Sequence, residues 1–435
     1  MRARKRGATF TRMLPDSISP ASTPAPSTSG RRPLGATVIA LATVSFLTDV
    51  SSDMIYPLLP GFLTASLGVS AAFLGVIEGA AESTAALLKL ASGWWSDRVT
   101  RRKPLVVAGY GIAALARPMI ALAASGTQLL FIRLADRVGK GIRSSPRDAL
   151  IADAVDARDR GRAYGLHRAA DNAGAVVGPL LAFALLGVGG LSLRTVFALA
   201  AIPGALAVVV LVMRVKEGGA TLIVPTMAGR HEDAAAGYAP RANATGPATL
   251  GAEFRTVMVS VFLFTLGNST DVFLLLRAHT LGVSGAQLPL LWALYNGVRA
   301  VASAPGGALS DRIGRRPVVL VGWALFAAVY AGFAVASMPW HVWTLFAVYG
   351  MTFGLTEGTE KALVADLTPV ALRGTAFGWY NLVIGIGALP ASVLFGVLWT
   401  SYSPAVAFGV GSAFAMVASL VLLQARLPAR ATGGG

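Results

Sequence analysis

Twelve apolar segments, each close in length to a membrane-crossing helix, dominate the sequence. They occupy residues 34–59, 71–95, 104–124, 127–149, 161–187, 192–213, 254–276, 286–309, 317–337, 341–365, 374–398 and 403–425. About 20 helical residues cross the roughly 30 Å hydrocarbon core of a bilayer. Because lipid offers no hydrogen-bond partners to the backbone, each segment is expected to be an α-helix. The sequence therefore predicts an all-α integral membrane protein with twelve transmembrane helices.

Composition supports this prediction and excludes several other classes of protein. Charged residues make up 13% of the 435-residue chain, against roughly 25% in soluble domains. The net charge of +16 could suit nucleic acid, but the basic residues lie in short runs between apolar segments and not on one soluble face. The chain has no Cys, and its four His are scattered without metal-ligand spacing. We therefore expect no metal, no cofactor and no nucleic-acid partner.

The distribution of Lys and Arg predicts how the helices are oriented. Basic residues cluster at the start of the chain and in three short loops, near residues 98–103, 158–162 and 312–316. On the other side, only Arg194 and Arg277 lie near helix ends. Because cytoplasmic loops carry the excess of Lys and Arg, both termini are expected in the cytoplasm. The expected location is the cell (inner) membrane.

Three polar stretches are predicted to lie outside the membrane. Residues 1–33 are rich in Pro, Ser and Thr, which indicates a disordered basic cytoplasmic arm. Residues 215–253 are rich in Gly, Pro and Ala and are expected to form a cytoplasmic linker. Residues 426–435 are expected to be a cytoplasmic tail. This division leaves an N-terminal six-helix bundle at residues 34–214 and a C-terminal one at residues 254–425.

The two halves of the chain repeat each other at a nearly constant spacing. Asp97-Arg98 recurs as Asp311-Arg312, 214 residues later, and Gly141 aligns with Gly354, 213 residues later. A parallel repeat with a linker between its copies predicts two bundles around a cavity near the middle of the membrane. Rocking of one bundle against the other would expose that cavity to each side in turn, which is the alternating-access mechanism.

A loop motif occurs once in each half. Residues 93–102 read Gly-Trp-Trp-Ser-Asp-Arg-Val-Thr-Arg-Arg, and residues 307–316 read Gly-Ala-Leu-Ser-Asp-Arg-Ile-Gly-Arg-Arg. Both resemble the loop signature of the major facilitator superfamily (MFS), the second more closely because Thr100 replaces a customary Gly in the first. The resemblance spans residues 34–425 and implies the MFS fold of two parallel-repeat six-helix bundles. It also implies a gating motif that closes the cytoplasmic side through charge pairing, made of Gly93, Asp97, Arg98, Arg101, Arg102, Gly307, Asp311, Arg312, Gly314, Arg315 and Arg316.

A further motif lies in the fifth apolar segment. Gly165, Gly174, Gly178 and Pro179 follow a G-x8-G-x3-G-P pattern. The pattern resembles the antiporter motif of proton-coupled drug exporters, although its last Gly is Ala182 here. The resemblance therefore implies the proton-coupled antiporter and exporter branches of the superfamily. The alternative reading is that these small residues serve close packing between membrane helices.

Carboxylates inside the segments are candidates for binding the coupling proton. Ionisable groups are costly in hydrocarbon and usually face a cavity or pair with one another. Desolvation favours the protonated form of a buried carboxylate, so such a group can bind and release a proton. The candidates are Asp49, Glu82, Asp53 and Glu78. Asp49 and Glu82 are preferred because they lie near mid-depth and far in sequence from the Arg-rich fourth segment; for each, a structural ion pair is the alternative.

A second set of polar residues is expected to line the substrate cavity. It comprises Arg133, Asp136, Arg137, Arg168, Asp171, Asn172, Asn268, Asn296 and Arg299. Asp136 and Asp171 are expected to be held ionised by Arg133, Arg137 or Arg168, because a neighbouring cation stabilises a carboxylate. The excess of Arg in the fourth segment could bind an anionic group of a substrate.

Together these features predict a secondary active transporter. The first hypothesis is a proton-coupled antiporter that exports a small organic molecule by alternating access and acts as a monomer. The alternative is a proton symporter or uniporter that imports an organic anion or a siderophore-like compound. A membrane-embedded enzyme would need a convergent catalytic set, and the sequence contains no HExxH motif, nucleophile elbow or P-loop. We therefore expect a transporter and not an enzyme.

Overall fold

Helices make up almost all of the chain that the structure describes. The computed structural model describes residues 34–96, 98–99, 101–155, 159–217, 250–369 and 372–425, and no strand occurs within these ranges. Asp97 and Thr100 of the first loop motif lie outside the described residues. So do the predicted arm (1–33), most of the predicted linker (218–249) and the predicted tail (426–435).

Each of the twelve predicted segments coincides with a long helical stretch. In the first half these are α1 (Ala36–Ile55) continued by η1 (Tyr56–Leu58), α2 (Leu59–Gly61) and η2 (Phe62–Ser66); α3 (Ala71–Ser96); α4 (Lys103–Met119) with η3 (Ile120–Leu122); α5 (Gly126–Asp153); α6 (Arg160–Phe183) with η4 (Ala184–Val188); and α7 (Leu193–Leu199) with α8 (Ala201–Arg214). In the second half they are α9 (Gly251–Gly267) with α10 (Val272–Thr280), α11 (Leu288–Ile313), α12 (Arg315–Val335), α13 (Pro339–Asp366), α14 (Arg373–Ser401) and α15 (Pro404–Gln424).

Three of these stretches are more polar than the others. Within the described residues, nine stretches are long and apolar enough to cross a membrane. The remaining helices α5, α11 and α13 have 28, 26 and 28 residues, which is also sufficient length. In α5, Arg133, Asp136, Arg137 and Arg143 are each at most 9% exposed. A helix this polar can lie in a membrane because its charges face the protein interior.

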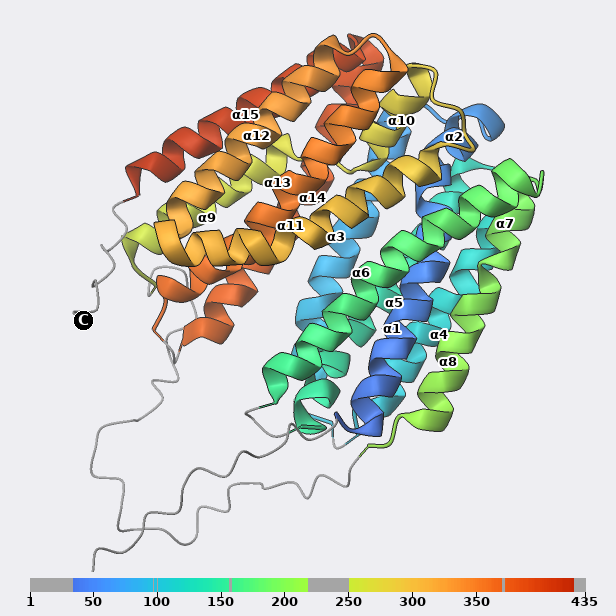
Figure 1. Cartoon of the computed structure of the whole chain (residues 1–435), viewed down its shortest axis with the longest axis vertical. Coiled ribbons are helices and arrows are strands. Elements are labelled where there is room, and N and C mark those ends of the chain that lie inside the picture. Colours follow the sequence, from blue (N-terminus) through green and yellow to red (C-terminus); the bar gives the residue numbers. More distant parts are fainter. Residues whose placement is uncertain are drawn as a thin grey trace, which may run out of the picture. The chain divides into compact units, whose positions relative to one another are not determined.

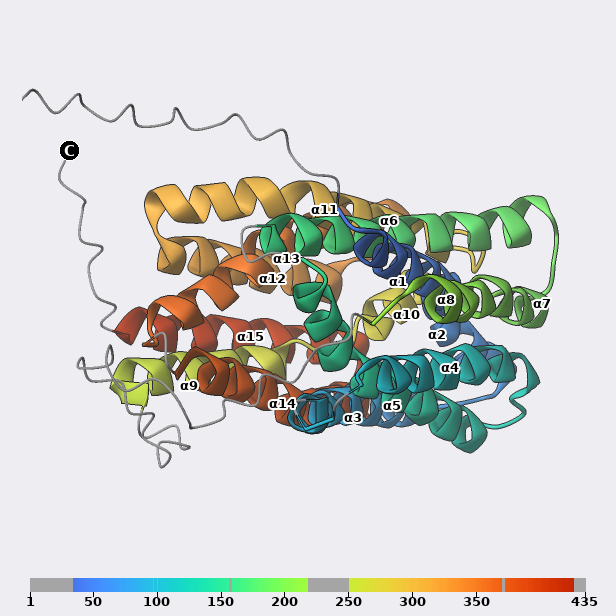
Figure 2. The same ribbon diagram turned by 90° about the horizontal axis from the view of Figure 1, so that it is seen from below.

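The helices form two groups that follow the two halves of the sequence (Figure 1). In the first half, α1 packs on α6 and α8, and α5 packs on α3 and α4; in the second, α13 packs on α11 and α12, and α15 packs on α9 and α12. The groups meet where α3 packs on α14 and α6 packs on α11 (Figure 2). This arrangement confirms the predicted fold of two six-helix bundles.

The two halves repeat side-chain contacts as well as sequence. Arg102, at the start of α4, forms an ion pair with Asp153 at the end of α5. Arg315, at the start of α12, forms the equivalent pair with Asp366 at the end of α13, over 3.4 Å. Both partners of the second pair lie 213 residues beyond those of the first. The end of the bundles at which these pairs lie is called the basic end below.

Two helical stretches are interrupted at equivalent positions of the two halves. After α1 the chain continues as the 3-10 turn η1, and after α9 it leaves the helical conformation at Asn268 (φ −91°, ψ 84°). Pro57 and Pro60 contribute to the first interruption because they lack the N–H that continues a helix. The two interruptions meet, since the hydroxyl oxygens of Tyr56 and Thr270 are 3.4 Å apart. In repeat-built membrane proteins, interrupted helices in corresponding positions point to the binding site.

The glycine motif of α6 packs that helix closely on α1. A Cβ added at Gly174 would lie 2.5 Å from the carbonyl oxygen of Phe46, and one added at Gly178 would lie 2.7 Å from that of Val50. Around Gly165, in contrast, the space is open. Close helix packing therefore accounts for two of the three glycines.

This difference predicts opposite effects of the same substitution. We expect Gly174→Ala to lower the free energy of unfolding by about 1–3 kcal/mol, the usual cost of overpacking. Gly165→Ala is the matched control and should be neutral or stabilising by up to about 1 kcal/mol, because Ala favours a helix over Gly. Unfolding of the detergent-solubilised variants measures both. Equal stability of the two variants would show that the α1–α6 contact tolerates a methyl group.

Candidate functional site

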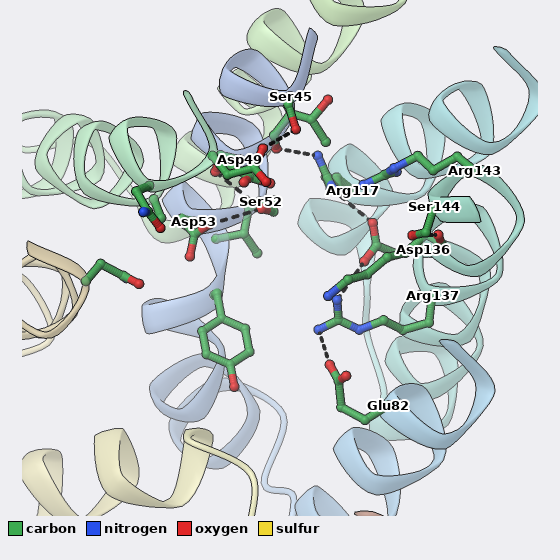
Figure 3. A pocket seen from close by; sticks show the side chains of 18 of the residues that line it. Ser45, Asp49, Ser52, Asp53, Glu82, Arg117, Asp136, Arg137, Arg143 and Ser144 are labelled. Atoms are coloured by element: carbon green, nitrogen blue, oxygen red, sulfur yellow. Dashed lines mark hydrogen bonds and ion pairs between the residues drawn. The ribbon is translucent and has the colours of Figure 1, made fainter. Parts of the chain in front are cut away.

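A polar cavity of about 430 Å³ lies between the two bundles, at the interruptions of α1 and α9. Its basic lining residues are Lys89, Arg117, Arg133, Arg137, Lys140, Arg143, Arg147, Arg168 and Arg299, and its acidic ones are Asp49, Asp53, Glu82, Asp136, Asp171 and Asp271. With every acid ionised, the lining carries 9 − 6 = +3 charges. Figure 3 shows Asp49 and Asp53 of α1 across the pocket from Arg137 of α5.

The cavity extends toward the basic end. A second cavity of about 520 Å³ shares Glu82, Lys140 and Arg299 with the first. Lys89 and Arg147 line the first cavity and lie seven and six residues before the ends of α3 and α5, which is roughly 10 Å along each helix. At the opposite end, α10 packs on η1 and α2 and joins the two bundles.

Arg133 of α5 holds Glu78 of α3 in a buried bidentate ion pair. Its Nε and Nη2 donate to the two carboxylate oxygens over 2.8 and 2.6 Å, and the two side chains are 6% and 1% exposed. Glu78 lines neither of the two cavities. Glu78 is therefore enclosed and ion-paired, which favours the structural alternative over a role as proton carrier.

Asp136 lies among three arginines. Its nearest partner is Arg117 of α4, whose Nε is 3.0 Å away, and nitrogens of Arg133 and Arg137 lie 3.9 Å from it. The two predicted partners are thus present, but the nearest one was missed. The signal that could have revealed Arg117 is a lone Arg inside the apolar segment 104–124.

Glu82 is paired with the Arg-rich helix, contrary to expectation. Arg137 Nη2 lies 2.9 Å from its carboxylate, because α3 packs on α5. Distance in sequence from the Arg row therefore does not keep Glu82 away from it in the folded chain. The Glu82 side chain is nevertheless 43% exposed and lines both cavities, so it keeps access to water and to a ligand.

The two acids of α1 differ in their partners. Asp53 accepts a hydrogen bond of 2.7 Å from Trp292 Nε1 of α11 and one of 3.2 Å from Ser52. It therefore links the first bundle to the second. Asp49 lies one turn earlier and lines the same cavity, but its carboxylate has no hydrogen bond or ion pair to any residue that the structure describes.

On α6, the predicted partner of Asp171 was wrong. Asp171 accepts a hydrogen bond from Ser45 and lies 3.4 Å from Nδ1 of His167. Arg168 instead pairs with Glu357 of α13, across the bundle interface. Neither His167 nor Glu357 belongs to a sequence motif that would have identified it as the partner of Asp171 or Arg168, respectively.

The second bundle contributes a smaller set of polar contacts. Arg299 donates to Glu357 over 2.6 Å, and Tyr349 donates to Asp271 over 2.6 Å.

Asn296 and Asn172 line the first cavity, and Asn268 lines the second. All nine predicted substrate-cavity residues therefore line one of the two cavities. The aromatic residues Tyr56 and Trp292 also line the first cavity, and their rings are 4.9 Å apart; nothing in the sequence distinguished them from core aromatics.

The second loop motif forms a cluster of ion pairs at the basic end. Arg315 lies 2.5 Å from Asp311 and also donates to Ser310 Oγ over 2.7 Å. Gly314 has φ +98°, a backbone conformation that favours Gly over other residues. In the first motif, Arg98 stacks on the ring of Trp94 at 3.7 Å. The contacts of the described motif residues thus lie within their own bundles. The predicted gate residue Asp97 is not among the described residues.

Within the described residues, no group of three or more His, Asp and Glu side chains could hold a metal ion.

Comparisons with known proteins identify the family. A model of the Major Facilitator Superfamily matches residues 41–269 and 257–434. An uncharacterized MFS-type transporter of Methanocaldococcus jannaschii is 33% identical over 402 residues, which cover 90% of this chain and 95% of that protein. The multidrug resistance protein MdtH of Cronobacter sakazakii is 33% identical over 107 residues, 25% of this chain and 26% of that protein. A crystal structure of the nucleoside transporter NupG is similar with a TM-score of 0.68 at 14% identity, covering 89% of this chain and 98% of that chain. The chain therefore belongs to the Major Facilitator Superfamily and is a multi-pass membrane protein with the fold of its secondary transporters.

Proposed function

We propose that this protein is a proton-coupled antiporter that exports a small organic molecule across the cell membrane as a monomer, with both termini in the cytoplasm. Under this proposal the basic end is cytoplasmic, as the excess of Lys and Arg indicates, and the cavity takes up its substrate from that side. The similarity to MdtH over a quarter of the chain favours export.

The observation that carries the proposal is the unpaired carboxylate of Asp49 in the cavity wall. A neighbouring Arg stabilises an ionised carboxylate and so opposes its protonation. Asp136 and Glu78 each form an ion pair with a buried arginine. Asp49 has no such partner among the described residues, so it is the carboxylate best placed to bind a proton on one side and release it on the other. Glu82 is the second candidate because its side chain remains exposed to the cavity.

The bond between Asp53 and Trp292 offers a way to couple protonation to movement. The two residues belong to different bundles, and rocking has to separate them. An ionised carboxylate accepts a stronger hydrogen bond than a neutral one. Protonation of Asp53 would therefore weaken this contact and favour separation of the bundles at the end covered by α10.

Proton symport of an organic anion is the second candidate function, and the cavity-wall cations that pair with no described carboxylate, Lys89, Lys140 and Arg143, favour it. A proton on Asp49 would remove a negative charge from the cavity and so strengthen the binding of an anion. When proton and substrate favour each other's binding, they move together, and an inward proton gradient then drives import. Antiport would instead require that the proton and the substrate exclude each other from the cavity.

A proteoliposome assay with an imposed pH gradient and a panel of cationic, neutral and anionic compounds distinguishes these functions. An antiporter moves each transported compound against the proton flow, and a symporter moves it in the same direction. A pH-sensitive dye inside the vesicles reports the sign. Transport of a compound with no accompanying proton movement would contradict proton coupling and leave a uniporter.

A further inference from the structure

Three of the nine cations in the cavity wall have no acidic partner among the described residues. Six of the nine pair with a carboxylate: Arg117 with Asp136, Arg133 with Glu78, Arg137 with Glu82, Arg147 with Asp148, and both Arg168 and Arg299 with Glu357. The three that remain are Lys89, Lys140 and Arg143. These three are the cations of the cavity wall that no carboxylate of the described residues pairs with.

Arg143 is the most informative of the three. Its side chain lies over the ring of Tyr110, with Cζ 4.3 Å from the ring centroid, and the residue is 6% exposed. A guanidinium has five N–H donors, yet none of them donates to a residue within the described ranges, and Nη1 is fully enclosed. A buried charge without a partner is strongly unfavourable. A buried, unpaired guanidinium in the cavity wall is therefore explained best if a bound ligand supplies its anionic partner.

Lys140 lies one turn before Arg143 on α5 and lines both cavities. Its side chain is exposed to the cavity, and its ammonium group has no hydrogen bond or ion pair to a described residue. Residues three apart on a helix are neighbours on one face. Figure 3 shows Arg143 and Ser144 on the wall of the pocket that faces Asp49. Lys140 and Arg143 thus present two unpaired cations from one helix face.

We propose that Lys140 and Arg143 bind an anionic group, a carboxylate or a phosphate ester, of the transported organic molecule. A guanidinium and an ammonium on the same helix face suit an oxyanion, which accepts charge-assisted hydrogen bonds from both. The aromatic pair of Tyr56 and Trp292 in the same cavity offers an apolar surface to the rest of the molecule. This inference deepens the proposed function by naming the substrate class, and it rests on that proposal in taking this cavity as the transport path.

The test measures binding to the full-length protein in detergent without a proton gradient. Three probes share a three-carbon skeleton and differ in charge: glycerol 3-phosphate, glycerate and uncharged glycerol. Choline is added as a cationic probe of similar size. We expect the two anions, and neither glycerol nor choline, to raise the unfolding temperature with saturation. The relative affinity of the two anions then distinguishes a phosphate site from a carboxylate site.

Variants locate the site. Lys140→Gln and Arg143→Gln should each weaken anion binding about tenfold or more, since each removes a charged hydrogen-bond donor. Lys140→Arg should restore binding to within about threefold of the unmodified protein. Lys361→Gln is the matched control: it removes the same charge from the wall of the second cavity, where Lys361 pairs with Glu357, and should change binding less than about threefold.

A second readout separates ligand binding from folding. Because Arg143 is unpaired, Arg143→Gln should leave the unfolding temperature of the ligand-free protein unchanged or raised, whereas a residue with a structural role would lower it. Stabilisation by choline and not by the anions would overturn the inference. Anion binding that is unchanged in both Lys140→Gln and Arg143→Gln would also overturn it. Anion binding that depends on these residues, together with no proton flux in vesicles, would uphold the inference and reject proton coupling.

Discussion

Glu78→Gln is expected to destabilise the protein by about 3–5 kcal/mol, the usual cost of breaking a buried ion pair by removing one partner. The substitution leaves the Arg133 guanidinium, 6% exposed, without the carboxylate that accepts two of its hydrogen bonds. Because α3 and α5 are tied together by this pair, the effect should appear as a lower unfolding midpoint in a denaturant titration of the solubilised protein.

Two further variants test this explanation. Glu82→Gln removes a carboxylate from the same helix, but its side chain is 43% exposed and its partner Arg137 keeps Asp136 at 3.9 Å, so its loss should cost less than that of Glu78. The double variant Glu78→Gln with Arg133→Gln should recover part of the lost stability, because no buried charge is left unpaired. A cost below about 1 kcal/mol for Glu78→Gln alone would contradict a structural role for the pair.

Asp49→Asn is expected to abolish transport driven by a pH gradient, reducing it by at least tenfold. Asparagine has nearly the shape of a protonated aspartate but cannot release a proton, so the coupling step would be lost. Exchange of substrate across the membrane without a gradient should stay within about twofold, because Asp49 is not paired to another described side chain. Both rates are measured in proteoliposomes with a transported compound found in the panel assay.

The control for Asp49 is Asp171→Asn. Asp171 accepts a hydrogen bond from Ser45 and lies beside His167, so its substitution should lower stability or substrate binding before it changes the coupling ratio. Full pH-driven transport by Asp49→Asn would reject this assignment. The coupling site would then be sought at Glu82, at Asp53 or at two acids of the second bundle that line the second cavity, Asp271 and Glu360.

The architecture could be predicted because its signals lie along the chain. A helix that crosses the bilayer needs a run of about 20 residues, and the repeat spacing that relates Arg102 to Arg315 places equivalent helices in two bundles. The interruptions at Tyr56 and Asn268 were missed. Their signals, Pro57 and Pro60 in one half and the polar run 268–271 in the other, become meaningful once the two are compared at the repeat spacing.

The sequence indicated which residues line the cavities, but it did not indicate which of their charges form ion pairs. Every residue expected to line the substrate cavity does line one of the two cavities, because a polar side chain in a membrane helix turns toward the protein interior. Distance along the sequence was a poor guide to partners. Glu82 lies far in sequence from the Arg row, yet α3 packs on α5 and brings Arg137 to 2.9 Å from it.

The sequence by itself determined the number of helices, their parallel repeat and which polar residues turn inward, because hydropathy and repeat spacing are properties of the chain read in order. The tertiary structure alone decided which charges neutralise each other. Arg168 reaches Glu357 across 189 residues, and Arg133 reaches Glu78 across 55, through contacts between helices that no local pattern specifies. That pairing leaves Asp49, Lys140 and Arg143 without partners among the described residues. Their place in the cavity wall follows from how the helices rotate and pack, which only the folded chain fixes.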